Sequence, residues 1–208
     1  NVGNQGPGAW GPQHGLAENS YWRYYEALYG MFGRLRQRHP RVIFQNCAGG
    51  GGRTDVGLLP FFEHTWVTDW QIAPRSISIT NGMTMALPPE YVDCYTGMGQ
   101  AGQRRGELDL QARRMLFGHP TVSAWSHLCG LPANSEQMAR IRHVIDLYKR
   151  LVRPMQRTSR IYHHTPELPG FDPHGWAVLE LASADRQRAI AGLFRLSDPA
   201  EPAYRLCF

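Results

Sequence analysis

Long apolar runs, paired cysteines and several catalytic motifs are absent from this sequence, and each absence excludes a class of protein. No run of roughly 18 apolar residues occurs, so no segment is typical of a membrane-spanning helix. The four cysteines lie far apart without a C-x-x-C pair, which argues against both a zinc site and a disulfide framework. The sequence also lacks a Walker A run, a G-x-S-x-G elbow and an H-E-x-x-H motif. Phosphate-loop, serine-hydrolase and zinc-protease chemistry are therefore not indicated, and we expect no membrane partner and no metal.

Lysine is almost absent as well, and the basic charge is carried by arginine. Lys149 is the single lysine among 22 basic residues, which face 17 acidic residues and give a formal net charge of +5. The arginines are spread from Arg23 to Arg205, whereas a nucleic-acid groove needs its basic residues in one patch. We therefore expect no nucleic-acid partner, and we interpret the charge as a solvated surface.

The apolar residues predict alternating helices and strands in a chain of 208 residues, 42% of them hydrophobic, which is enough to bury a core. Helical spacing and capping residues predict helices over about 19–39, 107–116 and 135–152. Short apolar runs predict strands over 41–45, 65–68 and 121–125. Segment 74–86 is expected to be a helix running into a strand, and 91–99 to be a loop. Such alternation predicts an α/β fold with parallel strand pairing.

The character of the chain changes in its last third. Two strand-like runs over 176–181 and 189–196 are joined by turn-forming residues and predict an antiparallel hairpin. Proline and glycine punctuate the chain between residues 158 and 173. We therefore expect residues 1–158 to belong to one domain and residues 159–208 to begin a second, antiparallel β-domain.

The most informative segment runs from Phe44 to Asp55 with the sequence FQNCAGGGGRTD, and it is followed by HTWVTD at His64 to Asp69. A strand that ends in a cysteine, four glycines and an arginine is suited to bring bare backbone close to a ligand. The second run brings Trp66 and an acid to the same edge if both strands belong to one parallel sheet or barrel. Hydrogen-bonding groups, an aromatic face and an acid are what a sugar substrate needs. The pattern therefore predicts carbohydrate chemistry.

Other motifs support competing interpretations less well. Gly97, Gly99 and Gly102 match G-x-G-x-x-G, but no acidic residue lies between Asp109 and Glu136 to hold a ribose about 20 positions further on. A nucleotide-binding α/β domain is therefore a remote alternative, and we interpret this segment as a loop.

Histidines and tryptophans offer further candidates. His119 and His127 flank a predicted strand and could touch a ligand, although a loop histidine that is merely hydrogen-bonded is commoner. The tryptophans considered as outer stacking sites or as contacts in a homo-oligomer are Trp10, Trp22, Trp70 and Trp125. Ordinary packing is the commoner role for each of them.

The two glycine-rich and tryptophan-containing runs together resemble a known pair of motifs. Residues 47–55 and 65–69 are similar to the C-x-x-G-G-x-R-x-D and W-x-S-D motifs of the family-thirty-six α-galactosidases, the bacterial melibiase group of clan D glycoside hydrolases. The resemblance covers residues 1 to about 155. It implies an α/β fold that is the second half of a (β/α)8 barrel, followed by the start of the family's C-terminal β-domain.

The resemblance also implies an activity and assigns roles to residues. It implies hydrolysis of terminal α-galactosyl residues of oligosaccharides with retention, by two carboxylates and without a cofactor. Asp69 matches the acid/base, although an aspartate after a strand is often only a helix N-cap. The residues that match or shape the galactosyl site are Cys47, Gly50, Gly51, Arg53 and Trp66. Of these, Arg53 is expected to position carboxylates.

One departure from the family pattern concerns the nucleophile. In the family it is the aspartate of a K-x-D motif on the preceding barrel strand, but here Lys149 lies in a predicted late helix and no aspartate precedes Asp55. We therefore expect the nucleophile strand to lie upstream of Asn1, the natural N-terminus to be missing and the 208 residues alone to be inactive. Trp70, where many relatives have an acidic or amide residue, is a second departure.

Several alternatives stay open. An α-N-acetylgalactosaminidase and a galactosyl transferase of the raffinose-synthase kind share the chemistry, and the pocket around Cys47 and Gly51 would decide between them. A non-catalytic sugar-binding barrel is the alternative from another class, and it would lack the upstream aspartate. The absence of a visible export signal favours the cytoplasm, but the expected loss of the N-terminus leaves the compartment open.

Overall fold

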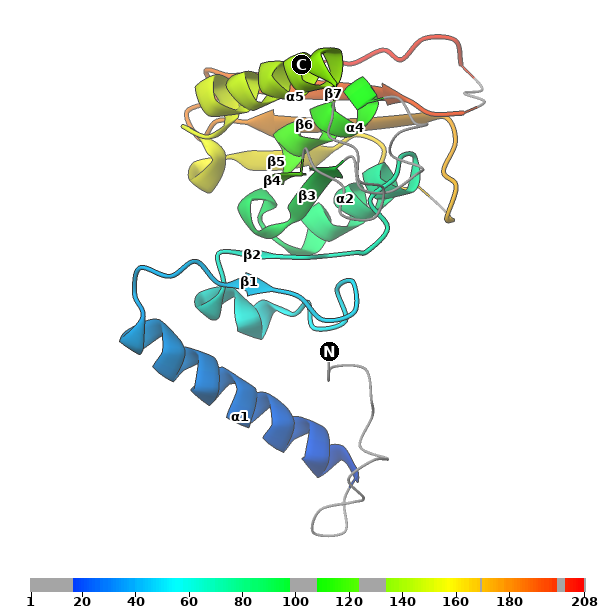
Figure 1. Cartoon of the computed structure of the whole chain (residues 1–208). Helices are drawn as coiled ribbons and strands as arrows, with labels where there is room; N and C mark the ends of the chain where they lie inside the picture. Colours follow the sequence, from blue (N-terminus) through cyan, green and yellow to red (C-terminus); the bar gives the residue numbers. More distant parts are fainter. Residues whose placement is uncertain (1–16, 98–107, 124–133, 169, 198–200, 208) are drawn as a thin grey trace. The chain divides into compact units, whose positions relative to one another are not determined.

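The computed structural model describes residues 17–97, 108–123, 134–168, 170–197 and 201–207. They fall into two compact units, within residues 1–69 and residues 70–208. The first contains one long helix and a short parallel strand pair, and the second contains a further parallel pair, three α-helices and an antiparallel sheet (Figure 1). The predicted boundary near residue 158 stays a prediction.

The first unit is built on α1 (Ala17–Arg38), close to the helix predicted over 19–39. Its inner face packs on the short 3-10 helix η2 (Val56–Phe61), which Asp55 caps. Aromatic rings fill the contact, and Phe32 meets Phe62 edge-to-face with centroids 4.5 Å apart. The cluster has Leu28, Leu58 and Phe62 at its centre and Tyr24, Tyr25, Tyr29, Phe32, Phe44 and Phe61 around it.

The strands of this unit are shorter than predicted. β1 (Gln45–Asn46) pairs in parallel with β2 (His64–Thr65), in the register Gln45 to His64 and Asn46 to Thr65. The prediction of a buried strand over 41–45 was wrong, because residues 41–44 do not belong to β1 and Ile43 is 73% exposed. Parallel pairing itself is confirmed.

The second unit contains a parallel pair with a strand that the sequence did not reveal. β3 (Asp93–Gly97) pairs in parallel with β4 (His119–Ser123), and α4 (Leu108–Arg114) lies between them in the chain. The prediction of a loop over 91–99 was therefore wrong for residues 93–97. Polar residues such as Asp93 and Thr96 obscured the pattern, yet both are buried. The Arg114 side chain is also buried beside this strand, and its Nη2 donates to the Tyr95 carbonyl over 2.6 Å.

Two further helices lie in segments that the sequence predicted to be helical, at least in part. α2 (Arg75–Ala86) is helical throughout, so the short strand expected at its end is absent. α5 (Ser135–Leu147) begins with a capping box, in which the Asn134 side chain accepts from the Gln137 backbone and the Gln137 side chain accepts from the Asn134 backbone. The helix continues as a π-helical turn, η5 (Tyr148–Val152), before Pro154. The cap predicted at Asn134 or Ser135 is therefore confirmed for Asn134.

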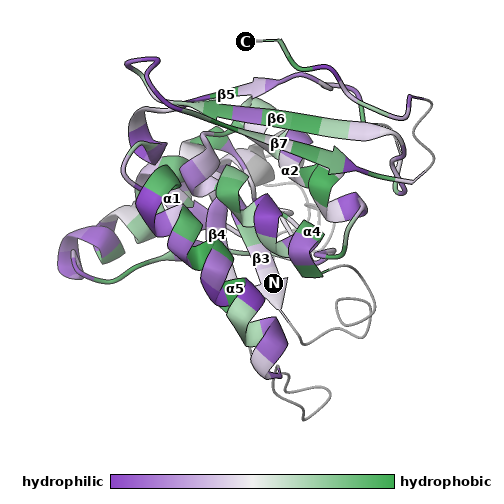
Figure 2. Cartoon of the chain, turned by 90° about the horizontal axis from the view of Figure 1, so that it is seen from above, coloured by the Kyte–Doolittle hydropathy of each residue, from purple (hydrophilic) through white to green (hydrophobic). Residues whose placement is uncertain are grey.

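The antiparallel sheet has the order β5 (Arg160–His163), β6 (Trp176–Ala182) and β7 (Ala189–Arg195), and it confirms the predicted hairpin. Figure 2 shows apolar residues along much of β6. The inner face of the sheet packs on α2 and on the turns around α4 and α5, so all share one core. That core consists of Ile77, Phe117, Val152, Met155, Ala177, Leu179, Leu181, Phe194 and Leu196.

Candidate active site

The glycine turn, residues 47–55, leaves β1 in a conformation that other residues rarely adopt. Gly49, Gly50 and Gly51 have φ angles of 55°, 68° and 103°. Positive φ is strained for residues with a Cβ atom, so three successive glycines allow a reversal that other residues would resist. The backbone conformation of the turn therefore explains why these three positions are glycines.

The glycine turn also folds directly onto the segment that carries Asp69. A Cβ atom on Gly51 would lie 2.3 Å from the carbonyl oxygen of Val67, well inside a normal contact. A Cβ atom on Gly50 would lie 2.7 Å from the backbone nitrogen of Asp69 and 3.0 Å from its Oδ2. The bare backbone at both positions therefore lets the turn reach the predicted acid, and the close approach is made by the chain itself.

Asp69 is held from a second side by Trp66. The indole Nε1 of Trp66 donates a hydrogen bond of 2.9 Å to the Oδ1 atom of Asp69. The backbone nitrogen of Trp66 donates over 2.7 Å to the carbonyl of Asn46, which fixes the residue to the end of β1. Asp69 is exposed, so its carboxyl group is oriented by the protein and accessible to solvent.

The structure does not support the alternative that Asp69 is a helix cap. α2 begins at Arg75, and its N-cap position is Pro74, with no side-chain cap hydrogen bond. Asp69 therefore lies six residues before the first residue of α2 and does not cap that helix.

Asn46 connects the two strands beneath the turn and was missed in the sequence analysis. Its side chain is buried, with 3% exposure, and its Nδ2 donates to the carbonyl of Arg53 and to Oγ1 of Thr65, each over 2.9 Å. The Oγ1 atoms of Thr54 and Thr65 lie 3.2 Å apart. The sequence signal for this role was weak: Asn46 is a polar residue at the end of an apolar run, directly before Cys47.

In the described contacts, Arg53 binds a backbone carbonyl of the glycine turn and no carboxylate. Its Nη2 donates over 2.9 Å to the carbonyl oxygen of Cys47, across the mouth of the turn. Its Nε is buried and has no hydrogen-bond partner among the residues described. Cys47 is exposed with a free thiol. The expectation that Arg53 positions catalytic carboxylates stays a prediction.

Asp55 completes the turn and has a structural role. Its carboxylate Oδ1 accepts from the backbone of Leu58 over 3.1 Å and from the hydroxyl of Tyr29 over 3.0 Å. Desolvation and the hydrogen bond to the carboxylate raise the pKa of Tyr29 to about 12. Asp55 thereby ties the glycine turn to η2 and α1.

The structure thus groups all the predicted site residues within the first unit, in contact with one another through the glycine turn and the segment 66–69. Gly50 contacts Asp69, Trp66 hydrogen-bonds it, and Arg53 binds the carbonyl of Cys47. The substrate-binding and catalytic roles of these residues stay predictions.

Of the other candidates, His119 lies in β4 of the second unit, and several lie outside the described residues. His119 begins β4, where its backbone nitrogen donates over 2.7 Å to Val92, and burial lowers the pKa of its imidazole. Residues 98–107, with most of the G-x-G-x-x-G match, and His127 are outside the described residues. Among the residues described, no group of histidines, cysteines and carboxylates could hold a metal ion, and no helix has the length and apolarity needed to cross a membrane.

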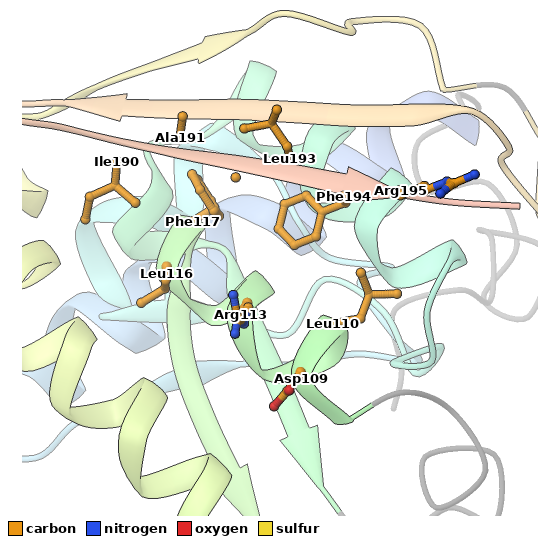
Figure 3. Close-up of a pocket in the computed structure, with 11 residues that line it drawn as sticks. Asp109, Leu110, Arg113, Leu116, Phe117, Ile190, Ala191, Leu193, Phe194 and Arg195 are labelled. Carbon is orange, nitrogen blue, oxygen red and sulfur yellow. The ribbon is translucent and has the colours of Figure 1, made fainter. Parts of the chain in front are cut away.

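A cavity of about 430 Å³ lies in the second unit, between α4 and β7 (Figure 3). Most of the residues that line it are apolar, and the rings of Phe117 and Phe194 meet edge-to-face there with centroids 5.9 Å apart. Asp109 and Arg113 line it from α4, but Asp109 is ion-paired to Arg140 over 2.9 Å. None of the predicted site residues lines this cavity, and we assign it no catalytic role.

Comparison with known proteins places the chain in a family. The sequence profile of the Melibiase family matches residues 3–157. The chain belongs to the melibiase family. The match includes the whole of the first unit's described part and extends through α5 of the second.

Curated relatives of this melibiase-family chain are α-galactosidases. Alpha-galactosidase 1 of Pediococcus pentosaceus is 24% identical over 183 residues, which are 88% of this chain and 24% of the relative. The alpha-galactosidase of Escherichia coli is 28% identical over 181 residues, 86% of this chain and 24% of the relative. Alpha-galactosidase 2 of Hypocrea jecorina is 33% identical over 108 residues, 50% of this chain and 14% of the relative. The chain therefore spans about a quarter of the length of the first two relatives.

Solved structures show that the fold is shared. A variant of the GH36 alpha-galactosidase AgaA from Geobacillus stearothermophilus, in complex with raffinose, matches with a TM-score of 0.73 at 22% identity, over 88% of this chain and 24% of that one. The galactosidase domain of the alpha-galactosidase-sucrose kinase AgaSK matches with a TM-score of 0.72 at 22% identity, over 90% of this chain and 25% of that one. The mixed α/β arrangement described above is therefore shared with about a quarter of each of these structures.

Proposed function

We propose that this chain supplies the acid/base part of the active site of a retaining α-galactosidase that removes terminal α-galactosyl residues from oligosaccharides. The observation that carries the proposal is the contact of the glycine turn and Trp66 with the carboxyl group of Asp69, in a chain of the melibiase family. The relatives' names and the complex of a structural neighbour with raffinose support the substrate class.

In the proposed reaction Asp69 protonates the oxygen that links galactose to the leaving group, and later removes a proton from the attacking water. The Oδ1 atom of Asp69 accepts the hydrogen bond of Trp66, which orients the carboxyl group. Gly50 leaves room beside Oδ2, where a side chain would otherwise stand. Cys47, Gly51 and Arg53 shape the turn on which the galactosyl group rests.

The second carboxylate is proposed to come from a strand upstream of Asn1. Retaining enzymes hold their two carboxyl groups about 5–5.5 Å apart, so that one attacks the sugar while the other protonates the leaving oxygen. The family's K-x-D motif is missing from this sequence, and the chain spans 24% of the Pediococcus relative. The 208 residues by themselves are therefore proposed to be inactive.

The proposed fold follows from the same comparison. The parallel pairs β1–β2 and β3–β4 would be successive strands in the second half of a (β/α)8 barrel, in which the site forms at the carboxyl ends of the strands. The antiparallel sheet β5–β7 would begin the C-terminal β-domain.

The test is hydrolysis of a nitrophenyl α-galactoside and of raffinose by the full-length protein that carries this chain, with the product followed by proton NMR. The proposal expects α-galactose as the first product, before mutarotation. A first product of β-configuration would contradict the retaining mechanism. Release of N-acetylgalactosamine alone, or transfer to sugar acceptors without hydrolysis, would favour the two related enzymes, and full inactivity with intact sugar binding would favour a non-catalytic barrel.

A further inference from the structure

We propose that Trp66 is a positioning residue for the acid/base, and that its indole N–H holds the Asp69 carboxyl group in the orientation that protonates the leaving group. The inference rests on the proposed function and deepens it. The sequence predicted that Trp66 shapes the galactosyl site, whereas the proposed role concerns one step of the reaction, the transfer of a proton to the departing sugar.

The backbone of Trp66 is fixed by its neighbours in the first unit. Its nitrogen donates over 2.7 Å to the carbonyl oxygen of Asn46, at the end of β1. Thr65 and Val67, on either side of it in the chain, are 3% and 7% exposed. The carbonyl oxygen of Val67 also lies so close to the backbone of Gly51 that a Cβ atom there would not fit. Because a tryptophan side chain has only two rotatable torsions, a fixed backbone leaves its indole few orientations.

The carboxyl group of Asp69 is held at both of its oxygens. Trp66 Nε1 donates over 2.9 Å to Oδ1. A Cβ atom on Gly50 would lie 3.0 Å from both Cγ and Oδ2 of Asp69, so the carboxyl group lies against the backbone of the glycine turn. Asp69 is nevertheless exposed, and the last torsion of an aspartate side chain has only broad preferences of its own. The two contacts therefore restrict a rotation that exposure would otherwise allow.

An indole N–H suits this role because it orients the acid without taking part in the proton transfer. The indole of tryptophan is a hydrogen-bond donor only, so it does not accept the proton that the carboxyl group delivers. A general acid must lie within hydrogen-bond reach of the oxygen that it protonates, and a misplacement of about 1 Å can reduce a rate about 100-fold. Fixing the carboxyl group in advance therefore favours the step in which the proton moves.

The proposed role makes the effect of Trp66 depend on the leaving group. In the first step the nucleophilic carboxylate bonds to the anomeric carbon, the bond from that carbon to the leaving oxygen breaks, and the Asp69 proton passes to that oxygen. Sucrose leaves raffinose with this proton, whereas the fluoride of α-galactosyl fluoride leaves as an anion without one. A residue that acts only by orienting the acid therefore affects raffinose and spares the fluoride. A residue that contacts galactose or maintains the fold affects both, because the two substrates share the galactosyl group.

The experiment measures kcat/KM of the full-length protein that carries this chain, as wild type and as Trp66→Phe. This parameter covers the steps up to the glycosyl-enzyme, so the later attack of water does not enter it. Phenylalanine keeps an aromatic ring and removes the Nε1–H donor. We expect kcat/KM on raffinose to fall about 10- to 100-fold, and kcat/KM on α-galactosyl fluoride to stay within about threefold of wild type.

The matched control is Trp22→Phe, which makes the same change in a tryptophan that is 68% exposed on α1 and should leave both substrates unaffected. An unchanged kcat/KM on raffinose in Trp66→Phe, or a fall on α-galactosyl fluoride as large as that on raffinose, would overturn the positioning role. If circular dichroism shows that Trp66→Phe does not fold, benzothienylalanine at position 66 keeps the bicyclic shape without the N–H and gives the same comparison. A wild-type protein that hydrolyses neither substrate would instead contradict the proposed function, and this inference with it.

Discussion

The glycine turn and the sheet β5–β7 show two different ways of fixing a backbone. The sheet has regular strands, with seven residues each in β6 and β7, and its central residues Leu179 and Leu181 are almost fully buried. The glycine turn follows a strand of two residues and is held by positive φ angles, by the buried Asn46 and by direct backbone contact with the Asp69 segment. Burial of apolar area stabilises the sheet, whereas short backbone contacts and hydrogen bonds hold the glycine turn.

The difference separates stability from chemistry. Removing side-chain atoms from the core beneath a sheet lowers the free energy of unfolding of the protein. The backbone hydrogen bonds between the strands still hold the sheet in its conformation. The glycine turn packs against the segment that carries the proposed acid, and a shift of about 1 Å in an active site can reduce a rate about 100-fold. Substitutions in the glycine turn should therefore act first on activity, and substitutions in the sheet first on stability.

The largest effect is expected for Gly51→Ala. The new Cβ would lie 2.3 Å from the Val67 carbonyl oxygen, at a φ of 103°, so the turn must move away from the Asp69 segment. We expect kcat/KM of the full-length protein on raffinose to fall at least about 100-fold. The control is Gly82→Ala in α2, where nothing lies within 4 Å of the new atom and where alanine should stabilise the helix. Equal activity of the two variants would contradict the prediction.

Leu179→Ala should lower stability and leave activity nearly unchanged, the opposite of what is expected for Gly51→Ala. The side chain is 1% exposed in the core beneath the sheet, and its removal leaves a cavity. We expect the free energy of unfolding to fall by about 2–5 kcal/mol, measured by urea denaturation, with kcat/KM within about twofold of wild type below the transition. A loss of activity at full folding would show that the sheet and the chemistry are coupled.

Asn46→Ala should have an intermediate effect on both properties. It removes the hydrogen bonds to the Arg53 carbonyl and to Thr65 Oγ1, and leaves their buried partners less well satisfied. The loss of stability should be about 1–3 kcal/mol. Because Asn46 joins the turn to β2, kcat/KM should also fall, by less than in Gly51→Ala. A variant with wild-type kinetics would show that the turn keeps its geometry without this residue.

The smallest effect concerns the pH dependence of stability. The folded-state pKa of Tyr29 is raised to about 12 by desolvation and by Asp55, above the ordinary value of 10.0. The folded protein therefore binds this proton more tightly, and the associated stability is present below pH 10 and lost as the pH rises towards 12. Tyr29→Phe should flatten this part of the stability curve in denaturation at several pH values. An unaltered slope would show that Tyr29 does not titrate in this way.

The elements that could be predicted from sequence are those with a local cause. The spacing of apolar residues in α1, the Asn134 cap of α5 and the alternation in β6 and β7 each act within a few residues, and the structure contains them. The glycine turn and its neighbours were predicted from the motif pair, and the structure brings Gly50, Trp66 and Asp69 together.

The elements that could not be predicted depend on partners far away in the sequence. β3 contains Asp93 and Thr96, and its polar burial is intelligible only beside Arg114, which donates to Tyr95 and to Gln71 across 19 and 43 residues. The role of Asn46 likewise depends on Thr65, 19 residues away. Nothing in the local pattern around Trp70 indicated that Arg75 would contact both its ring and that of Phe171, 101 residues further along the chain. The guanidinium carbon of Arg75 lies 4.0 Å from the centroid of the Trp70 ring and 4.5 Å from that of Phe171.

The most direct test of the role of Asp69 is azide rescue of Asp69→Ala in the full-length protein. With a nitrophenyl α-galactoside as substrate, kcat/KM should fall about 100- to 10,000-fold, because the general acid and base is lost. Azide needs no general base, so it should restore part of the turnover and yield α-galactosyl azide, the product of net retention. Undiminished hydrolysis by Asp69→Ala, without any azide product, would contradict the account and leave Asp69 as a partner of Trp66 only.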